Sequence, residues 1–404
     1  MAVGKVNFPQ MYAVPGIKLG TTCAGIKQAV HDDLLLIKMA EGATCAAVFT
    51  QNAFCAAPVV VARAHLQKKT RWLLVNSGNA NAGTGQQGMF DAQASCAAVA
   101  KLNGVTAEQV LPFSTGVIGQ LLPIVKIVEA LPGAQENLTE DNWSKAAQAI
   151  MTTDTFAKGY SKVVEINGQK ITITGISKGA GMIQPNMATM LGFIATDAKV
   201  SRGALQECLA SAVEQSFNRI TVDGDTSTND ACVLIASGQS TLPEIITGSD
   251  AMVAFQAAID EACMHLAELI IRDGEGATKL IKINVQQAGN EAEAVQVAKT
   301  IAHSPLVKTA FFASDPNWGR ILAAVGRAGV ECLDVERIKI YLGDVCIVEN
   351  GGCAAAYTEE AGQEVMNQEE ITVTVVLGRG KSEQRVLTCD FSYDYVRINA
   401  EYRT

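Results

Sequence analysis

The chain has 404 residues, of which 48% are hydrophobic and 18% are charged, and its formal net charge is −9. This length and composition predict a compact protein of one large or two ordinary domains with an ample core, and they exclude a disordered chain. The negative charge argues against a surface that binds polyanions, so we expect no nucleic acid among the partners.

Short apolar runs rich in β-branched residues recur along the whole chain and predict strands. Asn167-Gly168 separates two of these runs and predicts a tight hairpin. The predicted strands, in chain order, cover residues 34–39, 46–50, 59–62, 72–76, 162–166, 171–175, 191–196, 233–236, 278–285, 308–313, 338–342, 371–377 and 385–389.

Helical periodicity alternates with these runs. The longest predicted helix carries an apolar face that includes Phe255, Ile259 and Leu266, which is typical of a helix that faces a core. The mixture predicts an α/β fold of the mixed α+β kind, in layers of helices and mixed sheets. The predicted helices cover residues 91–101, 141–151, 204–217, 250–271, 290–301 and 320–329.

Signals for location and for metal binding are weak. Residues 1–10 contain no apolar signal core and no run of about 18 apolar residues occurs, so we expect a cytoplasmic protein without a membrane partner. The eleven cysteines contain no Cys-x-x-Cys pair, and the four histidines lie far apart, so we predict no metal. Residues 223–230 resemble a calcium loop in composition, but Leu234 replaces the closing glutamate, and we interpret them as a structural turn.

The most informative segment is the loop 178–190, which precedes the predicted strand 191–196. Its glycines permit unusual backbone conformations, and Pro185 fixes its own φ and restricts Gln184. A loop constrained in this way can hold one peptide bond in a chosen geometry, and Thr189 at its end is well placed to be a nucleophile. On composition alone, an ordinary turn before a buried strand is the simpler interpretation.

The same loop resembles the cleavage site of the bifunctional ornithine acetyltransferase and N-acetylglutamate synthase family of arginine biosynthesis. That resemblance implies an enzyme that moves acetyl from N-acetylornithine to glutamate and releases ornithine. Some members also accept acetyl-CoA; no recognisable CoA motif decides this here, and we expect no cofactor. The matching segments, with no departure at a position that the family uses for chemistry, are 75–81, 114–119, 152–155, 178–191, 220–230, 272–279, 315–320 and 394–404.

By this resemblance the precursor cuts itself at an Ala–Thr bond, which is Ala188–Thr189 in this sequence. The cut would leave fragments 1–188 and 189–404. Because the predicted strand 191–196 begins so close to the cut, we expect both fragments to share one core. The resemblance implies a sheet–helix sandwich built from both fragments, which pair again into a heterotetramer.

Self-cleavage would equip Thr189 for nucleophilic attack. A threonine hydroxyl needs a base, and the α-amine of a new amino terminus has an unperturbed pKa of about 7.7–8.0, against about 10.4 for lysine. That amine can therefore accept the hydroxyl proton near neutral pH. Before the cut no such amine exists, so we predict that Thr189 Oγ attacks the Ala188 carbonyl and that water hydrolyses the resulting ester.

The resemblance assigns the oxyanion hole to Thr115 and Gly116. A hydroxyl donor beside a glycine suits this role, because the bare glycine backbone lets its N–H come close to an oxyanion. The plainer interpretation is that residues 114–116 only end an extended segment at 110–113.

The family's substrate-binding positions fall on residues from both fragments. Lys178 offers a cation for a carboxylate, and Glu275 offers an acceptor for an ammonium or a proton shuttle, although either charge alone is usually a solvated one. The tail keeps apolar and aromatic residues almost to its end, which predicts docking instead of fraying. The positions are Thr152, Lys178, Thr189, Glu275, Asn399 and Thr404.

Two other functions stay open from the sequence. An autoprocessed aminopeptidase or amidase with an N-terminal threonine would use the same nucleophile, with water as the acceptor. A non-catalytic binding protein would keep the fold and leave the chain uncut.

Overall fold

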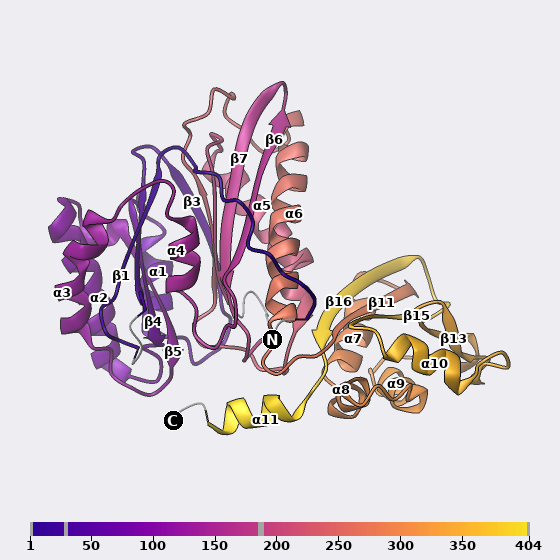
Figure 1. The fold of residues 1–404 in the computed structure, drawn as a ribbon. Coiled ribbons are helices and arrows are strands. Elements are labelled where there is room, and N and C mark those ends of the chain that lie inside the picture. The colour runs from indigo at the N-terminus through magenta and orange to yellow at the C-terminus, as the bar shows by residue number, and fades with distance from the viewer. Residues whose placement is uncertain (1–2, 28–30, 185–189, 402–404) are drawn as a thin grey trace.

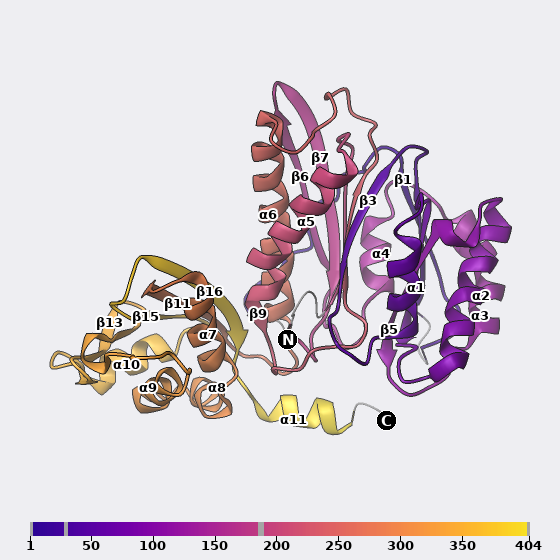
Figure 2. The same cartoon turned by 180° about the vertical axis from the view of Figure 1, so that it is seen from behind.

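The structure, a computed structural model, describes residues 3–27, 31–184 and 190–401. A larger lobe is built on a four-stranded and a five-stranded sheet, and a smaller lobe on a seven-stranded sheet (Figure 1). The C-terminal helix α11 (Tyr393–Ala400) leaves the smaller lobe and runs along one end of the larger lobe, as both views show (Figures 1 and 2).

The four-stranded sheet has the order β1-β2-β4-β5, and its β4 and β5 are parallel. Helices α2 and α3 cover its outer face through one apolar cluster, and α1 packs near β5. The elements of this layer are β1 (Ile17–Thr22), β2 (Leu34–Met39), α1 (Ala57–His65), β4 (Trp72–Asn79), α2 (Gly85–Asn103), η1 (Ala107–Gln109), β5 (Val110–Val117) and α3 (Ile124–Glu136).

The five-stranded sheet has the order β3-β10-β8-β7-β6. Its inner face packs on the four-stranded sheet around α4, and α5 and α6 cover its outer face. Because β8 lies between β7 and β10, segments from both sides of the predicted cut share one sheet. The elements are β3 (Thr44–Phe49), α4 (Trp143–Ala149), β6 (Lys158–Ile166), β7 (Gln169–Lys178), β8 (Leu191–Thr196), α5 (Arg202–Gln215), η2 (Phe217–Arg219), β10 (Ala231–Ala236) and α6 (Asp250–Arg272).

The seven-stranded sheet has the order β14-β13-β12-β15-β11-β16-β9 and packs on helices through a separate apolar cluster. The short strand β9 follows α5 of the larger lobe and pairs with β16, which ties the lobes together. The elements are β9 (Ile220–Thr221), β11 (Leu280–Ala288), α7 (Glu291–Ala302), α8 (Pro305–Phe312), α9 (Trp318–Gly326), η3 (Val335–Arg337), β12 (Lys339–Leu342), β13 (Val345–Glu349), β14 (Gly352–Cys353), α10 (Glu359–Met366), β15 (Glu370–Val376) and β16 (Ser382–Cys389).

The predicted fold class is confirmed: helices and mixed sheets alternate in layers, and the larger lobe is a sandwich of two sheets between helices. The hairpin at Asn167-Gly168 is also confirmed, since both residues have positive φ and Ile166 pairs with Gln169. None of the described helices is both long and apolar enough to cross a membrane.

Two predicted strands are wrong, because residues 59–62 lie in α1 and residues 308–313 lie almost entirely in α8. Each helix has a proline in its first turn, where a missing N–H costs nothing. In α8 the Ser304 side chain also accepts from the Val307 N–H and caps the helix. These start signals, together with packing against neighbouring elements, outweigh the β propensity of the valines and phenylalanines.

Candidate active site

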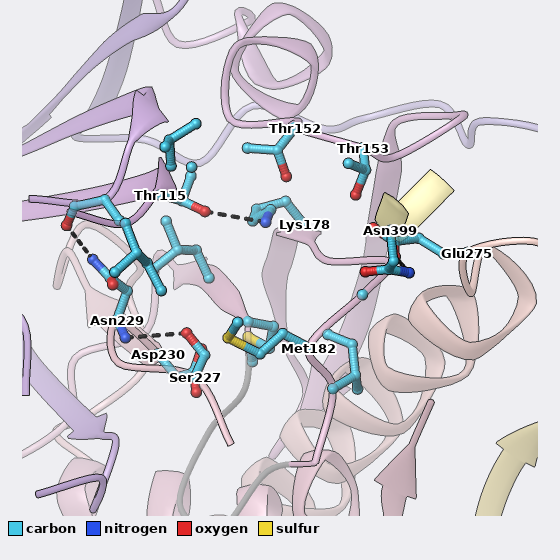
Figure 3. Close-up of a pocket in the computed structure, with 18 residues that line it drawn as sticks. Thr115, Thr152, Thr153, Lys178, Met182, Ser227, Asn229, Asp230, Glu275 and Asn399 are labelled. Carbon is cyan, nitrogen blue, oxygen red and sulfur yellow. Dashed lines mark hydrogen bonds between the residues drawn. The ribbon is translucent and has the colours of Figure 1, made fainter. Parts of the chain in front are cut away.

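A cavity of about 270 Å³ lies where segments of both lobes meet (Figure 3). The end of β5, the loop after α4 and the end of β7 contribute to its wall, together with the start of β8. Glu275, which follows α6, and Asn399 of α11 complete it. Stretches that are distant in sequence therefore converge on one small space.

The structure brings most of the sequence-predicted site residues to this cavity. Ala188, Thr189 and Thr404 lie outside the described residues, but Met190 and Leu191, which follow Thr189 in the chain, line the cavity. The predicted residues found in its wall are Thr115, Gly116, Thr152, Lys178, Glu275 and Asn399.

Gly116 occupies a position that only glycine fits. Its φ is +134°, and a Cβ built on it would lie 2.3 Å from the carbonyl carbon of Gly78 on the neighbouring strand. The parallel strands β4 and β5 approach closely at this point, where the pairing is irregular after Gly78. The close approach of the two strands therefore requires glycine at this position, and the absence of a side chain leaves the Gly116 N–H unshielded.

Lys178 connects the end of β7 to the end of β5. Its Nζ donates to Thr115 Oγ1 at 3.1 Å, and both residues are buried. Burial lowers the pKa of the Lys178 ammonium, while the carboxylates of Asp154, Asp230 and Glu275 oppose that shift. Because Thr115 Oγ1 accepts from Lys178, its own hydroxyl hydrogen is left to donate elsewhere.

A buried ionic triad holds three wall segments together, and sequence reasoning missed it. Lys158 Nζ lies 2.6 Å from an oxygen of Asp154 and 2.6 Å from an oxygen of Asp273. Asp154 also accepts from the N–H groups of Thr152 at 3.0 Å and Gly179 at 2.7 Å. Burial disfavours the charge of Asp154, but Lys158 and Lys178 outweigh it and hold the pKa of Asp154 well below its usual range.

The far end of the triad reaches the acidic loop that carries Glu275. Asp273 accepts from the N–H and the hydroxyl of Thr155, and the Glu275 N–H donates to Ala180 O at 2.8 Å. Asp154 stands inside the matched segment 152–155, so its presence was visible in the sequence. Its partner Lys158 gave no signal, because nothing local marks a buried lysine.

The C-terminal helix docks on this loop, in agreement with the pattern of the tail. Asn399 Nδ2 donates to Glu275 Oε2 at 2.8 Å, and Ser392 Oγ donates to Gly276 O at 2.6 Å. A Cβ on Gly276 would lie 2.4 Å from the Tyr395 backbone nitrogen, so the helix start needs glycine there. Although no residue of α11 is fully buried, these contacts orient Asn399 toward the carboxylate.

The loop 223–230 is a turn beside the cavity, as interpreted from the sequence, and it also makes hydrogen bonds to two neighbouring segments. Asp223 accepts from the N–H groups of Met182 at 2.7 Å and Ile183 at 2.9 Å, and so holds the loop before the predicted cut. Asn229 Nδ2 donates to Ala80 O and Ser114 O, next to the predicted oxyanion hole. Sequence reasoning assigned no role to Asn229 or Asp230, which both line the cavity.

Across the described ranges, no three His, Cys, Asp or Glu residues are grouped so as to hold a metal ion. The cavity instead presents a cation at Lys178, a carboxylate at Glu275 and a second carboxyl group at Asp230. Such a set can orient a small zwitterion and move protons around it.

Comparisons with known proteins agree with one another. The profile of the ArgJ family matches residues 18–404. The chain is 63% identical over 391 residues to the arginine biosynthesis bifunctional protein ArgJ of Methylococcus capsulatus, which covers 97% of this chain and 96% of that protein. It is 56% identical over 405 residues to the protein of the same name from Pseudomonas fluorescens, with both chains fully covered. A crystal structure of ArgJ from Bacillus halodurans has 42% identity and a TM-score of 0.51, and covers 53% of this chain and 100% of that one.

Proposed function

Since the chain belongs to the ArgJ family and is an acetyltransferase of arginine biosynthesis, we propose that it moves acetyl from N-acetylornithine to glutamate through an ester on Thr189. The convergence of Thr115, Lys178 and Glu275 on one cavity beside Met190 carries this proposal. These side chains supply a donor, a cation and an acceptor to a substrate that has a carboxylate, an ammonium and an amide.

The first step is self-cleavage between Ala188 and Thr189, which gives fragments 1–188 and 189–404. One observation on a relative supports it. The match covers the whole Bacillus halodurans chain but only 53% of this chain. Residues 189–404 alone make up about that share of this chain. The two fragments would stay together, because the ladders β7–β8 and β3–β10 each join a strand of fragment 1–188 to a strand of fragment 189–404.

Acetyl transfer then proceeds in two halves. The Thr189 α-amine accepts the hydroxyl proton, Thr189 Oγ attacks the acetamide carbonyl, and the oxyanion receives hydrogen bonds from the Gly116 N–H and the Thr115 hydroxyl. Since Thr115 Oγ1 accepts from Lys178, its hydrogen is left free to donate to the oxyanion. Ornithine leaves with a proton, and the amine of glutamate attacks the ester in the reverse sequence.

Substrate binding divides between the two charged ends of the cavity. Lys178 suits a substrate carboxylate, and Glu275, oriented by Asn399, suits an ammonium. The volume of about 270 Å³ is slightly below the about 300–1,000 Å³ typical of sites for drug-sized ligands, which fits an acetylated amino acid. If acetyl-CoA is also a donor, only its acetylated end enters, and the nucleotide stays outside.

The oligomeric assembly and the cellular location of the protein are further parts of this proposal. We expect two copies of each fragment in a heterotetramer, in the cytoplasm, with no cofactor. Thr404, which lies outside the described residues, is kept in this scheme as a substrate-binding residue.

Mass spectrometry of the purified protein tests the proposal. We expect two fragments, with the second beginning at Thr189, and the mass of one acetyl group added to that fragment after incubation with N-acetylornithine. Glutamate should remove the acetyl group faster than water does. Thr189→Ala should give one intact, inactive chain. An uncut wild-type chain refutes the proposal, and an acetyl-enzyme that decays equally fast without glutamate indicates an amidase. Incubation with acetyl-CoA tests the second donor.

A further inference from the structure

Asp230 lies beside Met190, the second residue after the predicted cut. It directly precedes β10, the parallel neighbour of β8, and the Ala231 N–H donates to Met190 O at 2.9 Å. Met190 is bonded to Thr189, so the strand pairing brings Asp230 to the level of the cleavage segment. Figure 3 shows Asp230 on the cavity wall, next to Ser227 and across from Lys178.

The Asp230 carboxyl group is buried and incompletely bonded. The residue is 3% exposed, and its Oδ2 has no hydrogen-bond partner among the described residues. Two titratable groups interact electrostatically with the Asp230 carboxyl group: Lys178 of β7, and Cys55, which precedes α1. Burial raises the pKa of Asp230 well above its usual range, although Ser227 and Lys178 oppose the rise. When ionised, such a carboxylate is a stronger base than an exposed one.

Self-cleavage needs a base that acetyl transfer does not need. The α-amine that activates Thr189 later is still part of the Ala188–Thr189 peptide bond in the precursor. Of the other charged side chains of the cavity, Lys178 Nζ donates to Thr115 Oγ1, and one oxygen of Glu275, Oε2, accepts from Asn399. A buried carboxylate oxygen without a partner in the described wall remains available at Asp230.

We propose that Asp230 is the general base of self-cleavage. Its Oδ2 takes the proton of Thr189 Oγ as the bond from Oγ to the Ala188 carbonyl carbon forms. It returns that proton to the Thr189 nitrogen as the peptide C–N bond breaks, which leaves an ester and a free amine. Water then adds to the ester carbonyl, the bond to Oγ breaks, and one proton restores the hydroxyl. Asp230 ends unchanged.

Asp230→Asn tests this inference, which rests on the proposed cut at Ala188–Thr189. Freshly synthesised precursor is followed on denaturing gels, with thermal unfolding as the check on folding. We expect cleavage to slow by at least about 100-fold, the lower end of what a general base contributes. Asp225→Asn is the matched control, because it removes an exposed carboxylate from the same loop and should leave the rate unchanged.

Chemical rescue separates a base from a structural role. Asp230→Ala leaves space for a small carboxylate, so added formate should restore cleavage, whereas chloride at equal ionic strength should not. Folded Asp230→Asn that is cut at the wild-type rate overturns the inference, and so does Asp230→Ala that formate leaves uncut.

The wild-type protein gives an independent check if both variants fail to fold. Its cleavage rate should rise with pH until Asp230 is ionised and then level off; a rate independent of pH overturns the inference. An uncut wild-type chain would instead refute the proposed function itself.

Discussion

Lys158→Met removes the cation at the centre of the buried triad and is expected to be strongly destabilising. The Lys158 side chain is 0% exposed and lies 2.6 Å from each of two carboxylates that are themselves 0% and 1% exposed. Methionine keeps the apolar stem but leaves Asp273 as a buried charge without a counterion and Asp154 with Lys178 alone. Removing one partner of a buried pair costs about 3–5 kcal/mol, and we expect a loss of unfolding free energy in that range.

Lys162→Met is the matched control on the same strand. Lys162 pairs with Glu261 at 2.7 Å, a distance like that in the triad, but the two side chains are 47% and 50% exposed. An exposed pair contributes about 0–1 kcal/mol, because water and salt screen it. Denaturant unfolding of the processed protein should therefore separate the two variants by several kcal/mol, with similar slopes.

The same pair of variants should differ in activity and in pH dependence. Asp154 holds the N–H groups of Thr152 and Gly179, so its displacement in Lys158→Met should lower acetyl transfer, while Lys162→Met should not. The stability defect should shrink as the pH falls, because protonation removes the unpaired buried charges. Equal stability losses in both variants, or a Lys158→Met defect that grows in acid, would show that burial of the triad is not what matters.

Three further predictions follow from the site and its surroundings. Thr115→Ala should lower kcat by about 10²–10³ with little change in KM, because it removes one oxyanion donor; unchanged turnover removes Thr115 from this role. Deletion of residues 399–404 should abolish acetyl transfer while self-cleavage continues, since Asn399 orients Glu275 but lies outside the cut segment; an active truncated enzyme contradicts this placement. Burial lowers the pKa of His303 to about 4, with Lys299, Lys308 and Arg327 adding repulsion. An unfolded histidine has a pKa of about 6.5. The stability gained by burying His303 in its neutral form is therefore complete above that pH and is lost as the pH falls toward 4. His303→Gln should flatten the change in denaturation midpoint over that range, and an unaltered pH profile would exclude His303 as its source.

Local sequence patterns predicted most elements: the apolar runs that predicted β2 and β8 and the 3.6-residue periodicity that predicted α6 lie within one residue of the observed bounds. They failed at α1 and α8, where runs with strand propensity pack as helices. Propensity is a local quantity, and the outcome there depended on a proline at the helix start and on the neighbouring elements.

The sequence alone indicated segments of the cavity wall, because Thr115, Lys178, Glu275 and Asn399 stand in recognisable motifs along the chain. Only the tertiary structure decided how those segments meet. The Lys158 triad and the unpaired oxygen of Asp230 depend on burial and on contacts between strands far apart in sequence. A lysine or an aspartate looks the same in a sequence whether water surrounds it or not. The removal of water, which the packed fold alone controls, decides whether such a charge only solubilises the surface or holds a cavity wall and accepts a proton.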